Sequence, residues 1–152
     1  MWARRLLAVI LAGVALPAFA QEREWTFDTG DEDAYLVFGV PESEDVGVSF
    51  GCRLQSGEIN VFIPEAGDGL KPDEKIKIVI SVADKDFRYD GLTAPNEMTG
   101  SSSAETTIQA RDPVFTALST TDRFMVRAGN EENTFPLAGA DFESLVRACG
   151  KA

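Results

Sequence analysis

The sequence of 152 residues contains no histidine and only two cysteines. Without histidine, the chain cannot form the usual catalytic triads, histidine-bearing metal sites, or the commonest general base at neutral pH. Basic residues are also scarce, because 14 Lys and Arg stand against 25 Asp and Glu. This negative charge repels phosphate backbones and anionic lipids, so we expect no nucleic-acid partner and no membrane binding after export. We expect a non-enzymatic protein without a cofactor; an enzyme that uses paired carboxylates is the alternative.

Internal repeats and long linkers are absent, and a long apolar run occurs only at the beginning. Two arginines precede an uncharged segment from Leu6 to Phe19, which ends in the small-x-small pattern Ala18-Phe19-Ala20 that signal peptidases recognise. The run is shorter than the roughly 20 apolar residues of a membrane-spanning helix. We therefore predict a signal peptide at 1–20, cleaved after Ala20, and a single β-rich domain at 21–152 that is periplasmic or secreted. An uncleaved membrane anchor is the alternative.

Cleavage would make the protein more acidic. It would remove Arg4 and Arg5 but no acidic residue, which leaves 12 basic and 25 acidic side chains and a net charge of −13. Nine of the carboxylates lie between Glu22 and Asp45, where Arg23 is the only basic residue. Most acidic surfaces serve solubility, but such a surface also tolerates cations and basic partners.

The two cysteines lie on the apolar faces of two predicted elements. Apolar residues alternate with small or polar ones from Val46 to Leu54, which predicts a strand with Cys52 on its apolar side. Apolar positions from Phe142 to Cys149 recur at i, i+3, i+4 and i+7, which predicts a helix that Asp141 caps. Two inward cysteines in an exported chain predict a disulfide, worth about 4.7 kcal/mol in the chain-entropy model for a loop of about 100 residues. Two separate buried thiols are the alternative.

The remaining patterns predict a mainly β fold. Glu74 to Ala83 is the clearest alternation, and Asp112 followed by Pro113 predicts the start of a short helix. We predict a β-sandwich or partly open barrel with a short internal helix and a C-terminal helix held by the disulfide. The other predicted strands are 25–28, 34–40, 58–63, 87–89, 106–110, 123–127 and 134–137.

One candidate site is an acidic turn. Asp28, Asp31 and Asp33 lie close together in the sequence around Gly30, and carboxylates at such spacing can bind a hard cation such as calcium. The segment does not match the helix-loop-helix calcium pattern, so a solvated hairpin turn is the alternative.

A second candidate is the polar segment from Leu92 to Thr107, which we predict to be a long loop. It contains Ser101, Ser102 and Ser103 and carries little charge. Long loops on rigid scaffolds often form contact surfaces, so the three serines are candidate interaction residues. A variable surface loop is the alternative.

Several stretches together resemble a known family. They are Val48-Ser-Phe-Gly-Cys52, the strand that ends in Ser81-Val-Ala-Asp84, and Phe135-Pro-Leu-Ala-Gly139 before the helix that ends at Cys149. This layout resembles the two-cysteine exported proteins that accompany type VI secretion, the VasI-like family, and related α-proteobacterial envelope proteins. Members of that family tend to carry Arg-x-Asp near the middle strand, where this chain has Val82-Ala-Asp84. The resemblance implies an exported accessory role and supplies no catalytic residue.

These observations lead to one functional expectation and one alternative. We expect a non-enzymatic periplasmic accessory or binding protein that contacts an envelope or secreted protein. The alternative is an inhibitor of an extracytoplasmic hydrolase such as lysozyme, which would insert the 92–107 loop into a basic enzyme's cleft.

Overall fold

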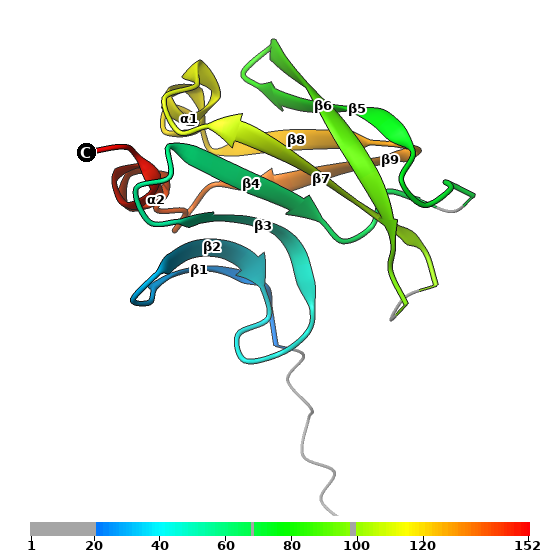
Figure 1. Ribbon diagram of the computed structural model, residues 1–152, viewed down its shortest axis with the longest axis horizontal. Coiled ribbons are helices and arrows are strands. Elements are labelled where there is room, and N and C mark those ends of the chain that lie inside the picture. Colours follow the sequence, from blue (N-terminus) through cyan, green and yellow to red (C-terminus); the bar gives the residue numbers. More distant parts are fainter. Residues whose placement is uncertain (1–20, 68, 98–99) are drawn as a thin grey trace, which may run out of the picture.

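The computed structural model describes residues 21–67, 69–97 and 100–152, so the predicted signal peptide at 1–20 lies outside the described residues. Within these residues, nine antiparallel strands form one sheet, which curls into a half-barrel beside two helices (Figure 1). The predicted mainly β, partly open barrel is therefore confirmed. The elements are β1 (Glu24–Thr29), β2 (Asp33–Gly39), β3 (Val46–Arg53), β4 (Glu58–Ile63), β5 (Lys75–Val82), β6 (Lys85–Pro95), β7 (Ser102–Gln109), α1 (Pro113–Leu118), β8 (Arg123–Ala128), β9 (Glu131–Pro136) and α2 (Phe142–Cys149).

The strand order in the sheet is β1-β2-β3-β4-β7-β6-β5-β8-β9. The first four strands follow one another as a meander. The next three return so that β7 lies beside β4, which is a Greek-key arrangement. After α1, the chain adds β8 next to β5, and β9 follows at the far side. The first and last strands, β1 and β9, are therefore the two edges of the sheet.

Aromatic rings fill the inner side of the half-barrel. The ring of Phe142, at the start of α2, lies 4.9 Å from that of Phe50 in β3 and 5.6 Å from that of Trp25 in β1. These contacts hold α2 against the inner face of the sheet. Where the edges approach each other, the Trp25 indole donates a hydrogen bond of 2.7 Å to the Pro136 carbonyl, and Phe38 contacts Phe135 at 5.8 Å. Side chains thus connect the two edge strands at this end.

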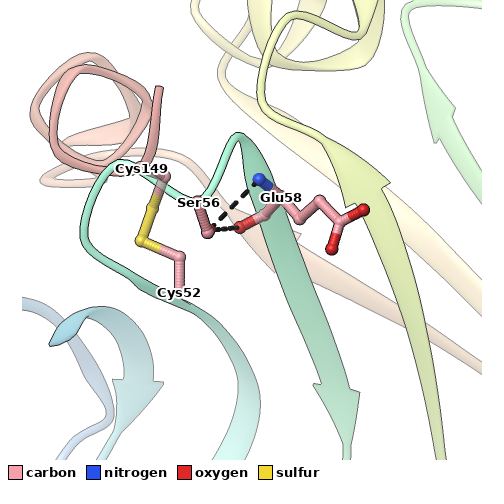
Figure 2. The surroundings of a disulfide bond; sticks show 4 residues. All are labelled: Cys52, Ser56, Glu58 and Cys149. Atoms are coloured by element: carbon pink, nitrogen blue, oxygen red, sulfur yellow. Dashed lines mark hydrogen bonds between the residues drawn. A yellow bond between two sulfur atoms is a disulfide. The ribbon is translucent and has the colours of Figure 1, made fainter. Parts of the chain in front are cut away.

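Figure 2 shows the disulfide that joins Cys52 in β3 to Cys149 at the end of α2. The two Cα atoms lie 5.7 Å apart and 97 residues apart in the sequence, and the predicted pairing is confirmed. The C-terminal carbonyls of α2 reinforce the link, because Ala148 and Cys149 accept hydrogen bonds of 2.9 and 2.7 Å from the amides of Gln55 and Gly57. The disulfide indicates an oxidising, extracytoplasmic compartment. No helix in the described part of the chain is long and apolar enough to cross a membrane.

The predicted long loop from Leu92 to Thr107 is wrong in extent. Strand β6 continues to Pro95 and β7 begins at Ser102, so only residues 96–101 connect them. Hydroxyl groups of β7 donate hydrogen bonds to backbone carbonyls: Ser102 donates to the Leu70 carbonyl at 3.1 Å and Thr106 to the Asp90 carbonyl at 2.6 Å. Hydroxyl side chains that find such partners can be buried in a sheet, so their polarity does not indicate a loop here.

Candidate functional site

A groove lies on the outer face of β1 and β2, where the connection between β2 and β3 covers one end. Its cavity volume is about 390 Å³. Tyr35 and Val37 of β2 line it together with Val40, Pro41 and Val46, and Asp28 of β1 adds a carboxylate. We define the groove face as the outward side chains of β1 and β2 together with residues 40–45.

The connection that covers the groove is tightly built. The Val40 amide donates to the Asp45 carbonyl at 2.8 Å, and the Ser43 hydroxyl donates to the Val40 carbonyl at 2.8 Å. Gly39 begins the connection beside a register shift, and a Cβ there would lie only 2.5 Å from the Asp45 carbonyl oxygen. Only glycine therefore permits this close approach of the two backbone segments. The groove is consequently formed before any partner arrives.

Tyr35 is the most exposed large apolar side chain among the described residues, with an exposed fraction of 50%. It pairs across the ladder with Gly51 of β3, and a Cβ at Gly51 would lie 2.5 Å from the Tyr35 ring. The ring therefore lies directly over the glycine backbone. Only one other large apolar side chain in the described part of the chain is similarly exposed, Leu92 at 45%.

The groove face carries charge of one sign. Glu24, Asp28, Glu42 and Glu44 are exposed carboxylates on or beside it. The only basic residue in this part of the sequence, Arg23, is held by Asp45 in an ion pair of 2.5 Å. An apolar groove with exposed carboxylates on and beside it fits a ligand that is both apolar and cationic.

Two other hollows lack this combination. The one around Leu92 has a volume of about 690 Å³ and mixes charges, with Lys75 beside Asp90 and Glu105. The other has a volume of about 330 Å³ and lies next to the disulfide, where Arg111 and Lys151 are among its lining residues. Neither joins an exposed aromatic ring to a surface of single charge.

The structure does not assemble the predicted cation site. Asp28 lies in β1, Asp31 in the turn and Asp33 at the start of β2. Residues 21–67, 69–97 and 100–152 contain no group of three or more carboxylate, cysteine or histidine side chains placed to hold a metal ion. Of the three aspartates, Asp28 lines the groove, whereas Asp33 is opposite Arg53 of β3.

The predicted interaction serines do not form an exposed loop. Ser102 and Ser103 belong to β7 and are buried, with exposed fractions of 7% and 5%. The Ser103 hydroxyl donates to the Ala94 carbonyl at 3.3 Å, and the Ser101 carbonyl accepts from the Asn96 amide at 2.9 Å. These serines close the β6–β7 hairpin, which is a structural role. Sequence reasoning missed the groove, because no local pattern shows that residues 40–45 fold back over β2.

Comparison with known proteins finds no match: no family model matches the chain, and neither does any curated protein or solved structure.

Proposed function

We propose that the protein is a non-enzymatic accessory protein of the periplasm, which binds another envelope or secreted protein through its groove face. The N-terminal apolar segment supports export, with cleavage after Ala20, and the disulfide suits the oxidising compartment that export reaches. The resemblance of the sequence layout to the VasI-like proteins supports an exported accessory role. Processing and binding are tested separately.

The observation that carries the binding proposal is Tyr35 beside a preformed apolar groove. Exposed aromatic side chains next to pockets are the residues that most often dominate the binding energy of protein interfaces. Because the backbone hydrogen bonds of residues 40–45 already fix the groove, a partner would not have to order it. The surrounding carboxylates would accelerate encounter with a basic protein.

Processing is tested by mass spectrometry of the protein from a periplasmic fraction. We expect a chain that begins at Gln21 and contains an intact disulfide. A chain that retains Met1 and stays with the membrane would contradict export with cleavage.

Binding is tested by affinity capture from gently crosslinked envelopes, comparing Tyr35→Ala with the matched variant Leu92→Ala. Both remove a large exposed side chain from the outer face of the same sheet. We expect the wild-type chain and Leu92→Ala to recover the same partner, and Tyr35→Ala to recover at least about tenfold less, since about 1.4 kcal/mol corresponds to tenfold in affinity.

The variants must first show the thermal midpoint of the wild type, and Tyr35→Phe serves as a second variant that keeps the ring over Gly51. Equal recovery by Tyr35→Ala and wild type, or equal loss in both alanine variants, would count against the groove face.

A basic hydrolase such as lysozyme is one partner of suitable charge, which keeps inhibition as the alternative function. Because 92–107 is mostly strand, we assign the inhibitory contact to the groove face instead. Adding the purified protein to a lysozyme assay tests this alternative. Inhibition that Tyr35→Ala abolishes would establish it, and unchanged activity at saturating protein would exclude lysozyme.

A further inference from the structure

Strand β1 is an open edge of the sheet. It pairs with β2 along residues 24–29, and no other strand within the described residues pairs with it. Trp25 is fixed to Pro136 at the beginning of the strand, so the open part runs from Thr26 to Thr29. Open edges present unpaired amides and carbonyls, which can bind an additional strand.

The two edges of the sheet differ in how they are protected. Strand β9 contains Pro136, and its Glu132 forms an ion pair of 3.1 Å with Arg127 of β8. The negative charge of the β9 edge is therefore partly neutralised. Strand β1 contains no proline, and its outward residues Glu24, Thr26 and Asp28 are exposed. Edge carboxylates repel another acidic strand but attract a basic one, so they select which strand can be added.

The groove lies next to this edge. Strands in a sheet lie about 4.8 Å apart, so a strand added to β1 would run beside Thr26 and Asp28 and lie two strands, about 9.6 Å, from the β2 backbone that carries Tyr35. Its lysine or arginine side chains could reach the carboxylates of Asp28 and Glu24. A large apolar side chain on the same face could extend over Thr26 into the near side of the groove, which Thr26 and Asp28 line.

We propose, resting on the function proposed above, that the partner supplies an extended basic segment that adds to the open edge of β1 as a further antiparallel or parallel strand. Main-chain hydrogen bonds to Thr26–Thr29 would provide affinity, and the carboxylates would provide selectivity for basic sequences. A second copy of this chain is a poor occupant, because it would bring the same acidic face to the interface.

The test uses the full-length processed protein and a short peptide that alternates lysine and valine. Binding is followed by calorimetry and by hydrogen exchange of backbone amides. Three peptides serve as controls: one alternating glutamate and valine, one with lysine and valine in scrambled blocks, and one N-methylated at every amide. The N-methylated peptide keeps the charge but cannot complete a hydrogen-bonded ladder.

We expect the alternating basic peptide to slow exchange of amides in β1 but not in β9, and to bind more weakly as salt rises. The N-methylated peptide should bind at least about tenfold more weakly, as should the variant Asp28→Lys. The matched variant Glu105→Lys, which changes an exposed carboxylate on the central strand β7, should leave binding near the wild-type level.

Equal binding of the N-methylated peptide would overturn strand addition, because charge alone would then explain the attraction. Absence of any peptide binding would overturn it as well. Neither result affects the capture experiment with Tyr35→Ala, so strand addition can fail while the proposed function stands.

Discussion

Tyr89 connects the barrel to helix α1. Its hydroxyl donates a hydrogen bond of 2.9 Å to the carboxylate of Asp112, which also accepts the Val114 amide as the N-cap of α1. Burial raises the pKa of the Tyr89 phenol well above its ordinary value, and the hydrogen bond and negative charge of Asp112 raise it further. The native state therefore holds the phenol proton more tightly than the unfolded chain does.

The consequence is a stability contribution that disappears in alkali. Because the pKa of Tyr89 is higher in the native state than in the unfolded chain, it contributes fully to the free energy of unfolding below the unfolded pKa of about 10. This contribution is lost as pH rises from the unfolded pKa toward the native pKa. We expect Tyr89→Phe to lower the free energy of unfolding by about 1 kcal/mol at pH 8, through the lost hydrogen bond. Urea unfolding at pH 8 and pH 11 should show this difference shrinking at the higher pH. A difference that stays constant or grows would contradict the link.

At the scale of elements, helix α2 depends on its cap. The Asp141 carboxylate accepts the Ser144 amide at 2.9 Å, and this hydrogen bond is the main cause that lowers the pKa of Asp141. Because the native pKa is lowered, the Asp141 carboxylate stabilises the native state at pH values above the unfolded pKa of about 3.9. This stabilisation is lost as pH falls through the native pKa.

We expect Asp141→Ala to cost about 1 kcal/mol at neutral pH, as N-cap removal usually does. The matched variant Glu143→Ala removes an exposed ion pair with Arg147 in the same helix and should cost less than about 0.5 kcal/mol. Chemical unfolding at pH 7 and pH 2 measures both. The Asp141→Ala difference should fall at pH 2, whereas equal effects of the two variants at pH 7 would show that the cap is unimportant.

The elements also show what the sequence could predict. Strand β3, strand β5 and helix α2 follow apolar periodicities that depend on local sequence, so they were predicted with nearly correct bounds. Strands β6 and β7 were underestimated because Thr93, Ser102 and Thr106 are buried hydroxyl residues whose partners are distant carbonyls. The groove depends on the connection at 40–45 folding back over β2, which no local pattern encodes.

For the whole molecule, the disulfide is the longest-range covalent constraint. It joins the inner face of β3 to α2 across 97 residues. Strand order, which places β4 beside β7, is similarly non-local and was not predicted from the sequence. The two cysteines, however, could be paired from the sequence because each lay on an apolar face.

We expect the double variant Cys52→Ser and Cys149→Ser to lose about 2–5 kcal/mol of stability, as is typical when a native disulfide is removed from a small exported domain. Urea unfolding of the oxidised wild type, the reduced wild type and the double variant measures this loss. The reduced protein and the variant should unfold at similarly lowered midpoints. Midpoints that agree with the oxidised protein would show that the disulfide adds no stability.

The most direct test of the central claim is site-specific photocrosslinking in living cells, with a photoreactive phenylalanine analogue at position 35 or at position 92. Both positions are exposed on the outer face of the sheet, so only their location differs. We predict that position 35 gives a discrete crosslinked species with a basic envelope or secreted protein, and that position 92 does not. The same species from both positions, or no species from position 35, would contradict the proposal that the groove face is where this protein acts.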